Sequence, residues 1–112
     1  KRKYPRYSRG GDVLIKTGWS PKHREEYVHM VPHVAFDKVV EVMAAVSSSK
    51  EVFRADDVVG KGDVPPYQSY VVLAFLRERG AVKDVRRGSY GFAKPASFAA
   101  DAAMLWDTVP HE

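Results

Sequence analysis

The chain has 112 residues, of which 45% are hydrophobic and 29% charged, and its formal net charge is +4. This length and balance are typical of one globular domain with its own core, and the lack of cysteine excludes disulfide bonds and thiolate zinc sites and fits a reducing cytoplasm. No apolar run approaches the roughly 20 residues that span a bilayer and no signal-peptide pattern opens the chain, so no membrane role is expected.

The positive charge is concentrated at the N-terminus. The first ten residues contain five basic and no acidic side chains, whereas the remainder contains 13 basic and 14 acidic ones. Residues 1–11 also hold a proline and a glycine pair without apolar periodicity, which predicts a flexible basic arm attached to a single domain over 12–112. We expect this arm to bind nucleic-acid phosphates, with Tyr4 and Tyr7 available for stacking on bases. Its basic side chains are Lys1, Arg2, Lys3, Arg6 and Arg9.

The first half of the domain is predicted to hold a short strand and two helices. Val13–Ile15 is a brief β-prone run. Ser20 followed by Pro21 is typical of a helix start, and that helix should end near Met30 because residues before a proline avoid the α region. A clearer amphipathic helix follows, ended by three serines. Its apolar stripe is Phe36, Val39, Val40, Met43 and Val46.

The second half is predicted to contain a short helix, a longer helix and a hairpin. Residues 54–59 form the short helix and the glycines at 60 and 62 the turn, after which a helix runs from Pro65 or Pro66 to Arg79 and ends at Gly80. Two β-prone runs, 81–85 and 89–93, flank the basic turn Arg86-Arg87-Gly88 and predict a hairpin. A last, alanine-rich helix begins near Ser97 and reaches Trp106.

This order of elements resembles the winged helix-turn-helix superfamily over roughly residues 34–92. The segment from Phe53 to Val58 is similar to the entry of its second helix, the segment from Leu73 to Val82 to the end of its third helix, and Arg86–Tyr90 to its wing. The expected fold is therefore α+β, a mainly helical winged helix-turn-helix with a small antiparallel β-hairpin wing, a basic N-terminal arm and a C-terminal helix. The resemblance implies contacts with DNA from Tyr67, Gln68 and Ser69 in the major groove and from Arg86 and Arg87 in the wing.

One segment of the helix predicted from Pro65 or Pro66 to Arg79 departs from that pattern. From Tyr70 to Leu76 the helix is apolar on every side, and a helix of that kind is buried on every side. The N-terminal elements, the C-terminal helix or another chain must cover it. An alternative function follows, in which a winged-helix scaffold serves as a protein interaction module or homodimer through this helix and the segment around Trp106.

Other patterns give little reason to expect an enzyme, a metal or a cofactor. His23, Glu26 and His29 lie three residues apart with His33 four further on, but they do not match the HExxH spacing and Pro32 interrupts them. The segment 60–63 lacks the ending of a phosphate-binding loop. The sequence thus predicts a non-enzymatic nucleic-acid-binding domain for transcription regulation. Duplex DNA is the favoured partner and RNA a lesser one.

Overall fold

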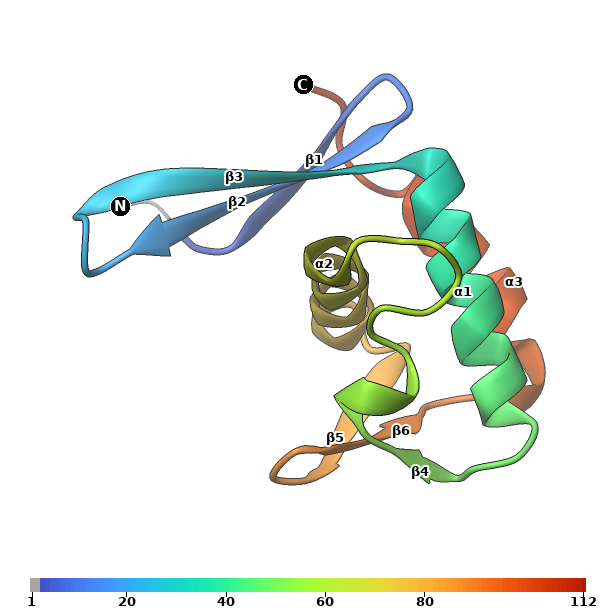
Figure 1. The fold of residues 1–112 in the computed structure, drawn as a ribbon. Coiled ribbons are helices and arrows are strands. Elements are labelled where there is room, and N and C mark those ends of the chain that lie inside the picture. The colour runs from blue at the N-terminus through green and yellow to red at the C-terminus, as the bar shows by residue number, and fades with distance from the viewer. Residues whose placement is uncertain (1–2) are drawn as a thin grey trace.

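The computed structural model describes residues 3–112, which form two small antiparallel sheets with three α-helices between them (Figure 1). No helix in this part of the chain is both long and apolar enough to cross a bilayer. The elements, with η denoting a 3₁₀ helix, are β1 (Arg6–Gly10), β2 (Val13–Ser20), β3 (Glu25–Pro32), α1 (His33–Ser47), β4 (Val52–Phe53), η1 (Ala55–Asp57), α2 (Pro66–Glu78), β5 (Val82–Arg86), β6 (Ser89–Phe92), η2 (Pro95–Ser97) and α3 (Phe98–Asp107).

The N-terminal arm is largely a strand, so the prediction of a flexible tail over 1–11 is wrong for Arg6–Gly10. These residues pair with β2, and the buried ring of Tyr7 lies 5.2 Å from that of Phe75 in an edge-to-face contact. The C-terminal tail extends the same sheet, because the Arg9 N–H donates to the Pro110 carbonyl at 2.8 Å. One inward aromatic side chain and backbone pairing on both edges fix a segment whose composition alone suggests disorder. Lys1 and Arg2 lie outside the described residues.

The helix predicted from Ser20 to Met30 is also wrong, because residues 25–32 form strand β3. Its side chains alternate, with Tyr27, His29 and Val31 directed inward and Val28 and Met30 exposed, which is the two-residue period of a half-buried strand. Ser20 and Pro21 enter the β2–β3 hairpin turn instead, and Arg24 adopts a left-handed conformation there with φ 53°. The local signals of a helix N-terminus were overridden by pairing with β2.

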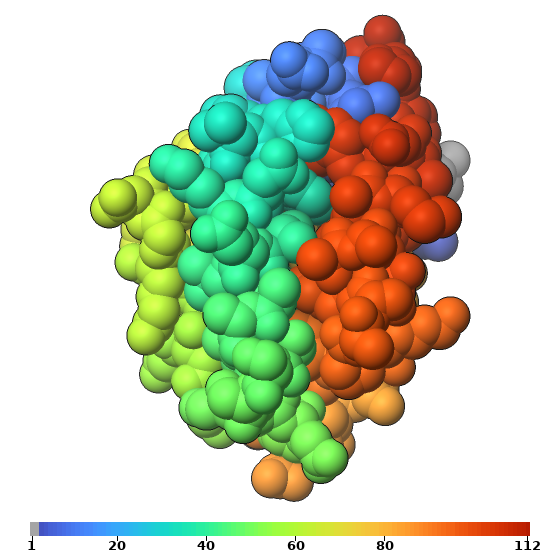
Figure 2. Space-filling model, turned by 90° about the vertical axis from the view of Figure 1, so that its right-hand side faces the viewer, coloured from blue at the N-terminus to red at the C-terminus, as the bar shows by residue number. Residues whose placement is uncertain are grey.

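The three helices form the core as the apolar patterns indicate. The stripe on α1 packs inward, and Phe36 meets Phe75 of α2 and Trp106 of α3 at ring-centroid distances of 6.0 and 4.9 Å. Helices α1 and α3 lie side by side across one face of the molecule (Figure 2). Helix α2 ends before Gly80, whose φ of +87° suits glycine at this position. The predicted α1, α2 and α3 are therefore confirmed.

The C-terminal sheet has the strand order β4-β6-β5 and contains the predicted hairpin. Strands β5 and β6 pair antiparallel. Their register is regular from Val82 to Asp84 and shifts between Asp84 and Arg86, next to the hairpin turn. Gly88 closes the turn with φ +77°. The short helix predicted over 54–59 is a single 3₁₀ turn, η1, rather than an α-helix.

Candidate nucleic-acid interface

Helix α2 carries an exposed strip along one side. Tyr67 and Tyr70 are 47% and 52% exposed, and Arg77 lies exposed two turns further along the same side. The remaining sides pack against β1, β3, α1 and β5 of the same chain. The expectation that this helix is buried on every side is therefore wrong at Tyr70. Its cover is intramolecular, which removes the helix as a reason to expect a partner chain.

The three residues predicted at the start of this helix have different environments. Tyr67 is exposed, and its hydroxyl accepts a hydrogen bond of 3.1 Å from the Gln68 side-chain amide. Ser69 is fully buried, and its Oγ has no hydrogen-bond partner among the described residues. Ser69 therefore cannot touch a ligand, and that prediction is wrong. It occupies the inward side of the first turn, next to positions filled by valines.

The basic residues of β1 are partly engaged within the fold. Arg6 contacts Glu26 at 3.3 Å and lies over the Tyr4 ring, 5.1 Å from its centroid. Arg9 lies over the Trp106 ring at 5.5 Å, and its Nη2 is 2.7 Å from the His111 ring nitrogen Nε2. These two guanidinium groups stabilise the N-terminal sheet rather than extending from a mobile tail. Lys3 remains exposed.

The wing brings together three arginines at the tip of the β5–β6 hairpin. Arg86 and Arg87 are exposed, as predicted. The Arg54 guanidinium lies beside Gly88, and its Nη2 is 3.3 Å from the position that a Cβ atom on Gly88 would take. None of the three has an ion-pair partner among residues 3–112. Sequence patterns could not reveal Arg54, because the β4–β6 pairing alone brings it beside a turn more than thirty positions away.

Asp57 fixes the backbone from which Arg54 extends. Its carboxylate accepts a 2.8 Å hydrogen bond from the Arg54 N–H and another of 2.8 Å from the Lys50 ammonium. The Arg54 hydrogen bond, followed by that from Lys50, lowers the pKa of Asp57 below its usual value. The carboxylate is therefore ionised near neutral pH and is committed to this loop.

A second basic tip lies at the end of the β2–β3 hairpin. Lys22, His23 and Arg24 are all exposed in the turn between these strands. The β2–β3 and β5–β6 hairpins extend in the same direction, on either side of α2 (Figure 1). The expectation of a helix from Ser20 concealed this arrangement, which only strand pairing produces. We define the two turns, 22–24 and 86–87 with Arg54, as the two basic tips.

Between the tips, aromatic rings continue from β3 onto α2. Tyr27 and His29 have ring centroids 5.0 Å apart, and His29 and Tyr67 have centroids 5.6 Å apart. An open groove of about 500 Å³ lies beside His29 and Tyr67, and Val28 and Met30 complete its lining. The Tyr27 ring lies directly on Gly18, where an added Cβ would stand 2.3 Å from it. Glycine at position 18 therefore allows the ring to lie close against β2.

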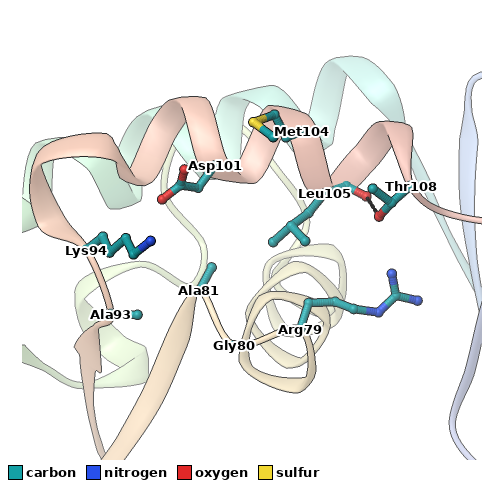
Figure 3. A pocket seen from close by; sticks show the side chains of 9 residues that line it. All are labelled: Arg79, Gly80, Ala81, Ala93, Lys94, Asp101, Met104, Leu105 and Thr108. Carbon is teal, nitrogen blue, oxygen red and sulfur yellow. Dashed lines mark hydrogen bonds between the residues drawn. The ribbon is translucent and has the colours of Figure 1, made fainter.

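A separate pocket of about 280 Å³ lies between α3 and the C-terminal end of α2 (Figure 3). Ala81, Ala93 and Leu105 form its apolar part, and Arg79 and Asp101 lie at its border. The Asp101 carboxylate accepts a 2.7 Å hydrogen bond from Ser97, and the Arg79 Nε donates to Glu78 at 2.7 Å. The Asp101 carboxylate and the Arg79 Nε are therefore already hydrogen-bonded within the chain. The pocket shares no residue with the two basic tips.

Comparison with known proteins does not assign the chain to a family. No family model matches it, and neither the curated proteins nor the solved structures include one with significant similarity. The two basic tips and the aromatic rings between them are therefore the features that bear on function.

Proposed function

We propose that this chain is a nucleic-acid-binding domain of winged-helix type that holds a double-stranded nucleic acid between its two basic tips. The winged-helix assignment is supported by the element order α1, β4, η1, α2, β5, β6 and by the strand order β4-β6-β5. In this arrangement α2 corresponds to the third helix of the fold and the β5–β6 hairpin to its wing. Transcription regulation is the process that such a domain would serve.

The observation that supports this proposal is the position of cations that have no ion-pair partner among residues 3–112, on either side of the exposed strip of α2. Lys22 and Arg24 lie at one tip, and Arg54, Arg86 and Arg87 at the other. Phosphate groups supply most of the affinity of such surfaces, because their neutralisation releases counterions. Arginine is the side chain best suited to bidentate phosphate contacts. The proposed affinity thus comes from the tips. Of the basic residues at the N-terminus, Lys3 is exposed, and Lys1 and Arg2 lie outside the described residues.

Charge reversal at the tips tests this function. One variant combines Lys22→Glu with Arg24→Glu, a second combines Arg86→Glu with Arg87→Glu, and a matched control combines Lys38→Glu with Lys94→Glu. All six positions are exposed, and Lys38 lies on α1, away from both tips. Fluorescence anisotropy with a random-sequence duplex should show both tip variants losing at least about 60-fold in affinity at 0.1 M salt, and the control losing little. Equal losses in all three variants would mean that only overall charge matters.

A second function is favoured by the free edge of the N-terminal sheet. Among the described residues no strand pairs with the outer edge of β3, and its Val28 and Met30 side chains are about half exposed. Such an edge can pair with another strand, so homodimerisation or capture of an extended partner remains the alternative. Sedimentation velocity at micromolar concentration distinguishes the two functions, since a monomer that binds duplex tightly would exclude the dimer.

A further inference from the structure

We propose that the groove between β3 and α2 takes unpaired nucleotides, so that the preferred ligand is a duplex continued by a single-stranded extension. This inference rests on the proposed nucleic-acid function and specifies its ligand. In it, the basic tips hold phosphates while the rings of Tyr27, His29 and Tyr67 stack with bases that leave the duplex. We call these three side chains the aromatic ladder.

The aromatic ladder is already arranged before any ligand binds. Its neighbouring ring centroids are 5.0 and 5.6 Å apart, and the rings reach from the hairpin to the first turn of α2. Tyr67 is held by the hydrogen bond from Gln68, and Tyr27 by its seat on Gly18. A surface ordered in this way loses little conformational entropy when a base stacks on it.

The chemistry of the exposed groups favours unpaired over paired bases. Bases inside a duplex have both faces covered by their neighbours, so an aromatic ring can stack only on a base that has left the helix. Reading paired bases in the major groove relies on polar or charged side chains directed at base edges, above all amide and guanidinium groups. The first turns of α2 expose Tyr67 and Tyr70, and the Gln68 amide is already hydrogen-bonded to Tyr67. This part of the helix is therefore better equipped for stacking than for edge recognition.

The charge around the groove favours a nucleic acid over a peptide strand. Lys22 and Arg24 stand at the hairpin tip, Lys16 lies on β2, and the carboxylate of Glu26 is compensated by Arg6. Glu25 is the remaining acid on this hairpin. The balance is positive, which suits a phosphate backbone running past the rings. The open volume of about 500 Å³ provides space for bases beside His29 and Tyr67.

Three fluorescent probes test the proposal with the full chain. The first is a blunt duplex, the second a shorter duplex extended by about six unpaired thymidines with the same number of phosphates, and the third a thymidine single strand. Stacking of one or two bases predicts that the extended duplex binds roughly tenfold more tightly than the blunt one. Equal affinities of these two probes would overturn the inference while leaving the proposed function intact, whereas absence of binding to every probe would overturn both.

Variants of the aromatic ladder identify the groove as the cause of the preference. Tyr67→Leu removes a ring but keeps an apolar side chain at an exposed position, and Tyr67→Phe is its matched control. We expect Tyr67→Leu to reduce the tenfold preference to about twofold or less, and Tyr67→Phe to retain it. Gly18→Val, which displaces the Tyr27 ring, should act in the same direction. A preference that persists in Tyr67→Leu and Gly18→Val contradicts the proposal. So does a dimer that Tyr67→Leu converts to a monomer, because a second copy would then occupy the groove.

Discussion

Removing the two exposed wing arginines gives the most informative perturbation of the proposed interface. Arg86 and Arg87 lie at the hairpin tip, make no ion pair among residues 3–112 and contribute nothing to the core. The double variant Arg86→Ala with Arg87→Ala should therefore fold normally. Its far-ultraviolet circular dichroism and thermal midpoint are expected to match those of the parent chain.

The size of the effect follows from counterion release. Each phosphate contact contributes about 0.9 to the slope of log K against log salt, which corresponds to roughly eightfold in affinity at 0.1 M salt. Loss of two contacts should weaken duplex binding by about 60-fold and make the slope shallower by about 1.8. Arg54 remains in the variant, so binding should be reduced but not abolished.

Fluorescence anisotropy titrations between about 0.05 and 0.3 M salt measure both quantities. The matched control, Lys38→Ala with Lys94→Ala, removes the same charge away from the wing tip, where screening beyond about 10 Å limits its influence. We expect the control to change affinity less than twofold. An unchanged salt slope in the wing variant, or an equal change in the control, would refute the assignment of phosphate contacts to the wing.

Three further predictions concern the core and the revised site. Ser69→Ala should leave duplex affinity unchanged, because Ser69 is fully buried, and weaker binding would contradict this placement. In urea titrations the variant should keep the free energy of unfolding or raise it by about 1 kcal/mol, because the Ser69 hydroxyl has no hydrogen-bond partner among the described residues. Phe36→Ala should lower the free energy of unfolding by about 3–5 kcal/mol, since it empties the ring contacts among α1, α2 and α3, and a loss below about 1 kcal/mol would show that the core is packed differently. Burial, and then the charge of Glu78, raises the pKa of Tyr7 from 10.0 to about 12, so the stability this phenol contributes is complete below pH 10 and is lost as the pH rises towards 12. The unfolding free energy of the parent chain should therefore fall relative to that of Tyr7→Phe over this range, and parallel pH profiles would contradict the assignment.

The elements predicted correctly are those whose signals are local. The stripe on α1 from Phe36 to Val46, the Pro66 start and Gly80 end of α2, and the glycine-containing turn of the wing each lie within one continuous segment. Such signals need no knowledge of the remaining chain. The exposure of Arg86 and Arg87 followed from the hairpin alone.

The sequence predicted a strand at Val13–Ile15, which lies in β2, but β1 and β3 of the N-terminal sheet were missed because their stability depends on distant partners. Tyr7 packs on Phe75, Arg9 lies over Trp106, and the last residues of the chain pair with β1. A window of ten residues contains none of these contacts, so basic composition dominated the interpretation. Likewise, Ser20-Pro21 satisfies the rules for a helix start, and only the pairing of β2 with β3 makes Ser20 the end of a strand and Pro21 part of the turn.

The same difference between local signals and distant contacts explains which residues of the candidate site could be predicted from the sequence. Tyr67 and the wing arginines were identified from their place in predicted elements. Lys22, Arg24 and His29 depend on the unpredicted β3, and Arg54 depends on pairing between β4 and β6. Ser69 was misplaced because its burial is set by which side of α2 faces the core, and the apolar run after it gave no clear side.

The salt dependence of duplex binding by the parent chain tests the central claim most directly. If the five cations of the two basic tips all contact phosphates, the slope of log K against log salt should be about −4.5. The tip cations are Lys22, Arg24, Arg54, Arg86 and Arg87. A slope between zero and about −1, or no measurable duplex binding at about 0.05 M salt, would contradict the claim that these two hairpins form one nucleic-acid-binding surface.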